Sequence, residues 1–278
     1  MKTLFFFTLL TLSTCDALNP LIDLGWINQN SLPPLVAPGL VCEDTLMLYC
    51  QKSVFNAYLN ISTDIDWKNY TAMGQAIDKF LLPDLTPGIF TLCQARSRFH
   101  SCLGAQYDSC MNPFTLMQRN LDLISAYEYV AMFKSLEFDC DGGNIQATKN
   151  WPCLYSVYTD PKYAAARNEC TSNYLSAVGN GTNYCTAGQN LLPCMARIFD
   201  QFPCASNADG SKIMDIRWFE CERYRVSFQI EGGCPSMSCS QIIFGSTGFY
   251  VDPGHSAYMH QQKMAFYDNL GKGSKKRR

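Results

Sequence analysis

Histidine is the residue that acid–base and nucleophilic catalysis most often use, and the sequence contains three, His100, His255 and His260. His100 stands near a cysteine in a helix-like stretch, which favours a structural or surface role. His255 and His260 lack the glutamate of a helical zinc-protease motif and follow a proline–glycine pair. The Gly-x-Ser-x-Gly, P-loop and dinucleotide-binding motifs are also missing. We therefore predict no catalytic residues and a protein that is not an enzyme.

Two further patterns contain some of the ligands of a known metal-binding motif but not all of them. The segment Asp139-Cys140-Asp141-Gly142 has acidic residues spaced as in a calcium loop, but it lacks the third acidic ligand and the closing glutamate. Cys234 and Cys239 have the spacing of a zinc knuckle, but no second knuckle or nearby histidine accompanies them. We expect a turn after a helix at the first pattern, a disulfide role at the second, and neither a metal nor another cofactor.

The fifteen cysteines point to disulfides rather than to metal binding. Residues 1–17 have the charged start, the short apolar run Leu4–Leu12 and the small-residue exit of a secretory signal peptide. Its cleavage removes Cys15 and leaves an even number, which can pair completely. A bacterial lipoprotein anchor at Cys15 is the weaker alternative, because Thr14 is bulkier than the usual preceding residue. The predicted disulfide residues are Cys42, Cys50, Cys93, Cys102, Cys110, Cys140, Cys153, Cys170, Cys185, Cys194, Cys204, Cys221, Cys234 and Cys239.

Helix geometry limits which cysteines can pair. Cys42 and Cys50 are eight residues apart, so on one continuous helix their Cα atoms lie about 12 Å apart, beyond the roughly 7 Å that a disulfide tolerates. We expect each to bind a cysteine of another helix. The 12-residue segments between Cys140 and Cys153 and between residues 221 and 234 can instead close on themselves. Sequence alone leaves the connectivity open.

Three sequons without proline mark candidate N-glycosylation sites at Asn60, Asn69 and Asn180. Such triplets also arise by chance. A chain that enters the secretory pathway meets the glycosyltransferase, however, so we expect at least two of the three to be occupied and all three to be exposed.

The formal net charge is −2, which argues against nucleic-acid binding by the folded body. Beyond the signal peptide no stretch is long and apolar enough for a membrane span, so we predict a secreted, extracellular protein. Residues 240–278 form a C-terminal tail that combines many aromatic residues with a basic end. We predict that this tail contacts a partner, and docking on the protein's own helices is the alternative.

Apolar residues recur at three- and four-residue steps after a proline-rich lead-in at residues 18–39. Side-chain oxygens followed by proline mark three helix starts, at Thr86-Pro87, Asn112-Pro113 and Asp160-Pro161. Glycine-rich turns such as 141–144 separate the helices. The predicted helices cover Glu43–Leu59, Asp66–Leu81, Leu121–Phe138, Ala187–Gln201 and Ser211–Ile230.

The cysteine spacing indicates an internal duplication. The series from Cys93 to Cys153 runs parallel to the series from Cys185 to Cys234, and two of the four gaps have equal lengths. The sequence around Cys140, Phe-Asp-Cys-Asp, corresponds to Phe-Glu-Cys-Glu around Cys221. We predict an all-α, disulfide-crosslinked helical bundle with two related cysteine-rich units, residues 40–153 and 165–239.

Three segments, residues 99–111, 138–144 and Asn150-Trp151-Pro152-Cys153, together resemble secreted cysteine-rich helical domains of nematode type, which include chondroitin-proteoglycan-like proteins and domains of unknown function. The resemblance covers about Cys42–Cys153 and extends only loosely to the second unit. It implies an extracellular, non-catalytic domain. No serine here is followed by glycine, the site at which proteoglycan cores attach their chains, so the resemblance does not extend to a chondroitin-bearing role.

These observations favour an extracellular binding or matrix module whose partner is an extracellular protein or glycan. A secreted carrier of a lipid or small molecule is one alternative, because helices joined by disulfides can enclose an apolar cavity. A secreted hydrolase with a site assembled from residues distant in the sequence is the other.

Overall fold

The computed structural model describes residues 37–81, 85–205, 211–230 and 233–240. The predicted signal peptide, most of the lead-in and the tail from residue 241 lie outside these residues. The chain divides into two units, residues 1–239 and 240–278. Its described residues form helices and no strand, which confirms the all-α class.

Helices in the first half of the described chain begin with α1, which continues directly into a π-helix, η3. The π-helical stretch lies within the single helix that the sequence predicts there. Their bounds are α1 Asp44–Tyr49, η3 Cys50–Asn56, α2 Tyr70–Leu81, α3 Leu85–Leu103, the 3-10 turn η4 Gly104–Gln106, α4 Tyr107–Cys110, α5 Pro113–Gln118 and α6 Leu123–Cys140.

The second half contains four long helices. The first of them, α7, was not predicted, because it follows two glycines without a side-chain cap and has Pro152 inside it. The bounds are α7 Asn144–Tyr158, α8 Pro161–Gly179, α9 Tyr184–Arg197, the 3-10 turns η5 Ile198–Gln201 and η6 Pro203–Ala205, and α10 Ser211–Phe228.

Two of the three predicted proline starts are confirmed. The Asn112 side chain accepts hydrogen bonds from the amides of Phe114 and Thr115 at 2.8 and 3.3 Å, and Asp160 caps α8 in the same way. The start at Thr86-Pro87 is wrong, because α3 already begins at Leu85. Pro87 therefore lies inside the first turn, where amides have no helical partner and proline is tolerated.

A helix was predicted over Asp66–Leu81, and the observed helix α2 begins four residues after the predicted start, at Tyr70. The reason is a local turn in which Asp66 accepts from the amide of Lys68 at 3.0 Å and Asn69 accepts from the amide of Ala72 at 3.0 Å. Short polar side chains thus take up the backbone amides that a longer helix would have used.

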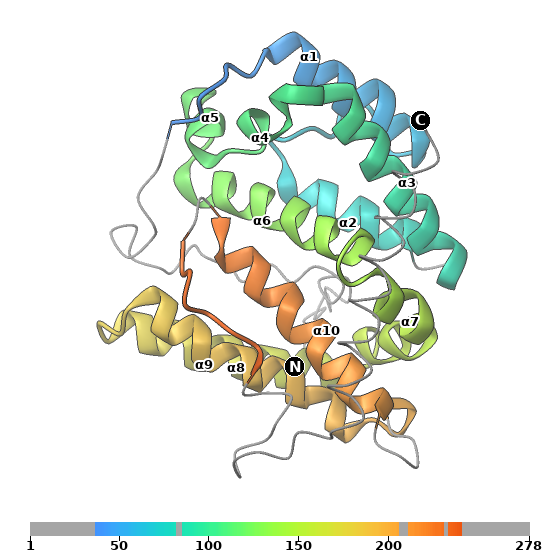
Figure 1. The fold of residues 1–278 in the computed structure, drawn as a ribbon, viewed down its shortest axis with the longest axis vertical. Helices are drawn as coiled ribbons and strands as arrows, with labels where there is room; N and C mark the ends of the chain where they lie inside the picture. The colour runs from blue at the N-terminus through green and yellow to red at the C-terminus, as the bar shows by residue number, and fades with distance from the viewer. Residues whose placement is uncertain (1–36, 82–84, 206–210, 231–232, 241–278) are drawn as a thin grey trace, which may run out of the picture. The chain divides into compact units, whose positions relative to one another are not determined.

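Helix α6 is the central element of the unit. Every residue from Ala126 to Phe133 is buried, as expected for a helix surrounded by others. It packs against α10 and against α3, while α9 packs on α10 and α8 packs on α9. In Figure 1, α6 and α10 lie between the blue and green N-terminal helices and the yellow pair α8 and α9.

The fourteen cysteines form seven disulfides. As predicted, Cys42 and Cys50 bind other segments, and their partners' Cα atoms lie 4.9 and 5.7 Å away. The remaining bridges join Cys93 to Cys140, Cys153 to Cys204, Cys170 to Cys194, Cys185 to Cys234 and Cys221 to Cys239. The segments 140–153 and 221–234, whose closure the sequence left open, do not close on themselves, because Cys140, Cys153, Cys221 and Cys234 each pair with a cysteine of another segment.

The bridges repeat one pattern twice. Among the six cysteines from 42 to 140, the first pairs with the fifth, the second with the fourth and the third with the sixth. The same order holds for cysteines 153, 170, 185, 194, 204 and 234, and the bridge Cys221–Cys239 is additional. We call these the first and second bridge sets. In this pattern Cys234 corresponds to Cys140, so the predicted correspondence of Cys140 with Cys221 is wrong for the bridges. No disulfide joins the two sets, and their limits, 42–140 and 153–239, differ from the predicted units because Cys153 pairs with Cys204.

Candidate functional site

Two similar sequences, Phe-Asp-Cys-Asp around Cys140 and Phe-Glu-Cys-Glu around Cys221, meet where α6 packs on α10. The rings of Phe138 and Phe219 have centroids 5.6 Å apart, and each ring is followed in sequence by a buried acid. Gly143 lies against both rings, and a Cβ added there would come within 2.9 Å or less of each. The junction therefore depends on glycine at this position.

Four elements contribute side chains to a buried charged cluster at this junction. The Arg223 guanidinium of α10 donates from Nε to Asp139 of α6 at 2.9 Å. One turn earlier on α10, the Glu220 carboxylate accepts hydrogen bonds from the hydroxyls of Tyr158 on α7 and Tyr163 on α8, at 2.6 and 2.8 Å. All five residues are buried, so the charges are compensated within the protein rather than by solvent.

Burial controls the ionisation of the two acids. The pKa of Asp139 is raised to about 6, because burial and the nearby Glu220 together outweigh the lowering by Arg223. Burial also raises the pKa of Glu220 above its usual range, against the influence of Arg223 and the two tyrosine hydroxyls. Although burial disfavours the charge on Arg223, Asp139 and other neighbours raise its pKa. Pairs of acids with raised pKa values also occur in catalytic sites.

The cluster borders a cavity of about 30 Å³ between α2, α3, α6, α7 and α10. This volume is an order of magnitude below the roughly 300 Å³ of small-molecule sites. Every side chain around it is buried. The residues that line it are Gly74, Ile77, Asp78, Leu81, Ile89, Leu92, Met132, Ser135, Leu136, Asp139, Trp151 and Arg223. The cluster thus has acid–base groups but a space that fits a water molecule rather than a substrate.

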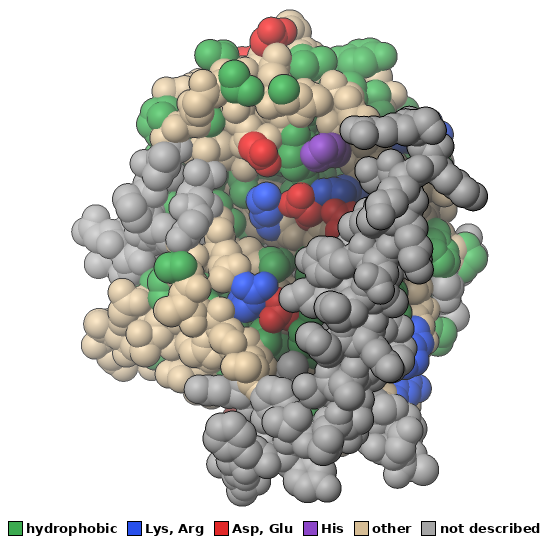
Figure 2. Space-filling view, viewed as in Figure 1, with side chains coloured by type: hydrophobic (Ala, Val, Ile, Leu, Met, Phe, Trp, Pro, Cys, Tyr) green, Lys and Arg blue, Asp and Glu red, His purple; other side chains and the backbone are tan. Residues whose placement is uncertain are grey.

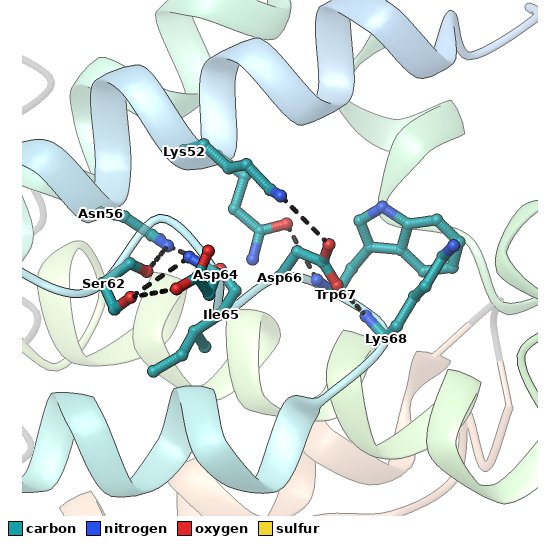
Figure 3. A network of polar contacts seen from close by, with 9 residues as sticks. Lys52, Asn56, Ser62, Asp64, Ile65, Asp66, Trp67 and Lys68 are labelled. Carbon is teal, nitrogen blue, oxygen red and sulfur yellow. Dashed lines mark hydrogen bonds and ion pairs between the residues drawn. The ribbon is translucent and has the colours of Figure 1, made fainter.

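A second buried polar network holds the loop between η3 and α2 (Figure 3). The Gln51 side chain accepts from the backbone amide of Trp67 at 3.1 Å. Asn56 donates to the carbonyls of Ser62 and Ile65 at 3.0 and 2.7 Å. Gln51 and Asn56 both belong to the π-helix, and π-helical segments often occur at functional sites. Here the segment fixes the loop that carries two of the three sequons.

The three sequon asparagines are exposed. Asn60 has a positive φ of 53° in the loop after η3, a conformation that asparagine tolerates. Asn69 caps α2 through Oδ1, which leaves Nδ2, the atom that a glycan modifies, free of that bond. Asn180 ends α8. Their glycosylation stays a prediction.

A surface pocket of about 320 Å³ lies where residues 37–44 meet α5. Leu40 and Val41 beside it are 54 and 82% exposed. Arg119 lines the pocket, donates to the carbonyl of Cys42 at 2.6 Å and pairs with Asp44, which neutralises its charge. The pocket lining consists of Ala37, Pro38, Leu40, Val41, Cys42, Asp44, Phe114, Thr115, Gln118 and Arg119.

Charged side chains elsewhere are paired rather than segregated by sign. On the face in Figure 2, acidic and basic groups lie next to each other around a histidine. Arg96 pairs with Glu137 at 2.8 Å and with Asp141 at 2.9 Å, and Lys149 pairs with Asp215 at 2.9 Å. Among the described residues of that face, this mixture of signs leaves no extended basic surface for a polyanion.

The residues that the sequence singled out for metal or acid–base chemistry are not brought together. Among the residues that the structure describes, no group of three or more histidine, cysteine, aspartate or glutamate side chains is placed to hold a metal ion. Asp139 and Asp141, which suggested a calcium loop, bind Arg223 and Arg96 instead. His100 is exposed on α3 with its ring 4.4 Å from that of Tyr107. His255 and His260 lie outside the described residues.

The buried cluster itself was not predicted. Its acids, Asp139 and Glu220, occupy the same place in the similar local sequences Phe-Asp-Cys-Asp and Phe-Glu-Cys-Glu, and this was the one signal that could have indicated it. Arg223 and the two tyrosines give no such signal, because they come from separate helices.

No known protein family matches this chain. Searches of curated proteins and of solved structures give no match either. Among the described residues, no helix has the length and apolarity needed to cross a membrane. The seven disulfides indicate that the protein folds in an oxidising compartment.

Proposed function

We propose that this protein is a secreted, non-enzymatic binding module that recognises an extracellular protein through its surface. The observation that carries the proposal is the pocket at residues 37–44, beside which two large apolar side chains, Leu40 and Val41, are exposed together. Adjacent exposed apolar residues around a pocket are typical of interaction surfaces. The disulfides support the proposal, because a crosslinked scaffold presents a surface with little loss of entropy on binding.

The chemistry of the pocket favours a protein segment with apolar side chains over a glycan. Its one cation, Arg119, is already paired with Asp44, so the pocket is close to neutral. Leu40 and Val41 offer hydrophobic contact, and Phe114 adds an aromatic side chain. A volume near 320 Å³ accommodates one or two anchoring side chains of a partner.

Val41→Asp in the full secreted chain tests the proposal by partner capture from the medium of the source tissue. Ile145→Asp is the matched control, because Ile145 is also a large exposed aliphatic residue, at 66%, but lies on α7 away from the pocket. We expect Val41→Asp to lose a specific protein partner, Ile145→Asp to retain it, and both to melt like the parent. Equal capture by both variants contradicts the proposal.

Residues 18–36 precede the pocket in the chain and are the competing occupant. Their deletion separates the two cases. Increased partner capture by the deletion variant identifies the pocket as the partner's site, whereas a lowered melting temperature with no capture by any variant shows that the pocket belongs to the protein's own packing.

The carrier and hydrolase alternatives have their own tests. A lipid extracted from the purified protein and identified by mass spectrometry favours a carrier. Turnover in an unbiased hydrolase screen that is abolished by changing one histidine favours an enzyme. The predicted contact role of residues 240–278, which lie almost wholly outside the described residues, is tested by truncation at Ser240. Lost partner capture with an unchanged melting temperature supports this role. The resemblance to nematode-type secreted domains implies an extracellular, non-catalytic domain, and we include it in the proposal of a secreted binding module.

A further inference from the structure

Two buried polar atoms beside the small cavity have no hydrogen-bond partner in the protein. One is the acceptor Oδ1 of Asp139, whose other oxygen binds Arg223, and the second is the donor Nε1 of Trp151. The two side chains are only 3 and 1% exposed, and both line the cavity. Buried polar groups are almost always hydrogen-bonded in folded proteins, so an unsatisfied donor and an unsatisfied acceptor on two residues that line one cavity point to a bound group that satisfies both.

The size of the cavity identifies the chemical class of that group. A water molecule needs a cavity of at least about 10 to 15 Å³ on the same measure, and the volume here is about 30 Å³. Sugars, lipids and amino acids are far too large. A metal ion would need several acidic ligands and would not accept a hydrogen bond from an indole N–H.

We infer that this cavity binds one structural water, which accepts a hydrogen bond from Trp151 Nε1 and donates one to Asp139 Oδ1. The Ser135 hydroxyl and the Asp78 carboxylate line the same cavity and offer it further polar neighbours. Buried waters typically make about three such bonds.

The position of the water gives it a role in joining the two bridge sets. Asp139 lies on α6, whose Cys140 belongs to the first set. Trp151 lies on α7 and Arg223 on α10, and these two helices carry Cys153 and Cys221 of the second set. Because no disulfide crosses between the sets, the contact between them is noncovalent. The water bridges α6 to α7 at the point where Arg223 bridges α6 to α10. This inference is independent of the proposed function.

Solution NMR on the intact protein tests the inference directly. We expect the Trp151 indole N–H to show a cross-relaxation signal to a long-lived water and slow exchange with solvent. A crystal structure should show one water within about 3.2 Å of both Trp151 Nε1 and Asp139 Oδ1. A dry cavity, or a direct bond between these two atoms with no water between them, overturns the inference.

Trp151→Phe provides the second test, because it removes the donor and retains an aromatic ring. Trp218→Phe is the matched control, since Trp218 on α10 is only partly buried and does not line the cavity. Expected is loss or displacement of the water in the first variant and an unchanged water in the second. A water that keeps its position and occupancy in Trp151→Phe contradicts the assigned hydrogen bond.

Discussion

Opposing effects act on the pKa values of Asp139 and Asp122, which lie near the two ends of α6. Asp139 has a cation 2.9 Å away, yet burial raises the pKa of its carboxyl to about 6. Asp122, the cap of α6, is largely exposed, and the hydrogen bonds from Ser125 lower its pKa even though burial acts in the opposite direction. The same residue type thus titrates in opposite directions at the two ends of one helix.

This contrast predicts how stability depends on pH. In an unfolded chain an aspartate titrates near pH 4. Between about pH 4 and pH 6 folded Asp139 still holds a proton that the unfolded chain has released, so its contribution to the free energy of unfolding falls as pH rises. The free energy of unfolding, measured with urea at pH 4 and at pH 7, should therefore fall less in Asp139→Asn than in the parent. We expect the difference to be on the order of 2 kcal/mol.

Asp122→Asn is the comparison with the opposite sign. Because the folded pKa of Asp122 is lowered, its contribution is present at neutral pH and is lost as pH falls below about 4. This variant should be less stable than the parent at pH 7 and closer to it in acid. The assignment for Asp139 fails if its asparagine variant keeps the parent's full decline between pH 4 and pH 7.

At the scale of elements, close contacts decide where helices cross. The junction of α6 and α10 leaves no space for a side chain at Gly143, because a Cβ would meet both Phe138 and Phe219. The neighbouring Gly142 is different, since a Cβ there would lie 3.4 Å from Phe138, an ordinary contact. One glycine of the pair is therefore required by packing and the other is not.

We accordingly expect Gly143→Ala to destabilise the protein by about 1 to 3 kcal/mol, the usual effect of overpacking a buried contact. Gly142→Ala should change stability by much less. Chemical denaturation of both variants measures the difference. Equal effects would show that the rings move aside, and that the junction does not depend on Gly143.

The start of α2 carries a cap and a sequon on one residue, which allows the two roles to be separated. Asn69→Gln removes both, whereas Thr71→Ala removes the sequon and keeps the Asn69 side chain that caps α2. Intact-mass measurements should show loss of one glycan in both variants. Only Asn69→Gln should also lose about 1 kcal/mol of stability, measured after enzymatic deglycosylation of all samples. No change of mass in either variant would refute glycosylation at this site.

At the scale of the whole molecule, the disulfides form two closed sets of equal pattern. The first set binds α3 to α6 and to the N-terminal segment, and the second binds α8, α9 and α10 and their neighbours. The two halves contact each other where α6 packs on α10, through the rings of Phe138 and Phe219 and the buried ion pair of Asp139 with Arg223. Disulfides stabilise each half, whereas only the backbone of residues 141–152 and noncovalent packing join the two halves.

Peptide mapping without reductant tests this arrangement. Trypsin digestion of the denatured, unreduced protein should yield four disulfide-linked groups of peptides, two with cysteines up to residue 140 and two with cysteines from residue 153 onward. No crosslinked peptide should connect the groups, and no cysteine of the seven bridges should react with an alkylating agent. A crosslink between Cys140 and Cys153 would contradict the assigned connectivity.

The sequence by itself determined the features that depend on nearby residues. Caps at Asn112 and Asp160 and apolar spacing of three and four residues indicate helices, because these signals act within one or two turns. The separation of Cys42 and Cys50 excludes a bridge between them for the same local reason. The all-α class and the presence of disulfides follow from such evidence.

Only the tertiary structure decided which distant residues meet. Cys153 could pair with a neighbour or across the chain, and its bond to Cys204 depends on how α7 packs. The cluster of Asp139, Glu220 and Arg223 exists because α6 and α10 cross at one particular register. Such contacts are settled by the summed packing of all helices, and no local pattern encodes that sum.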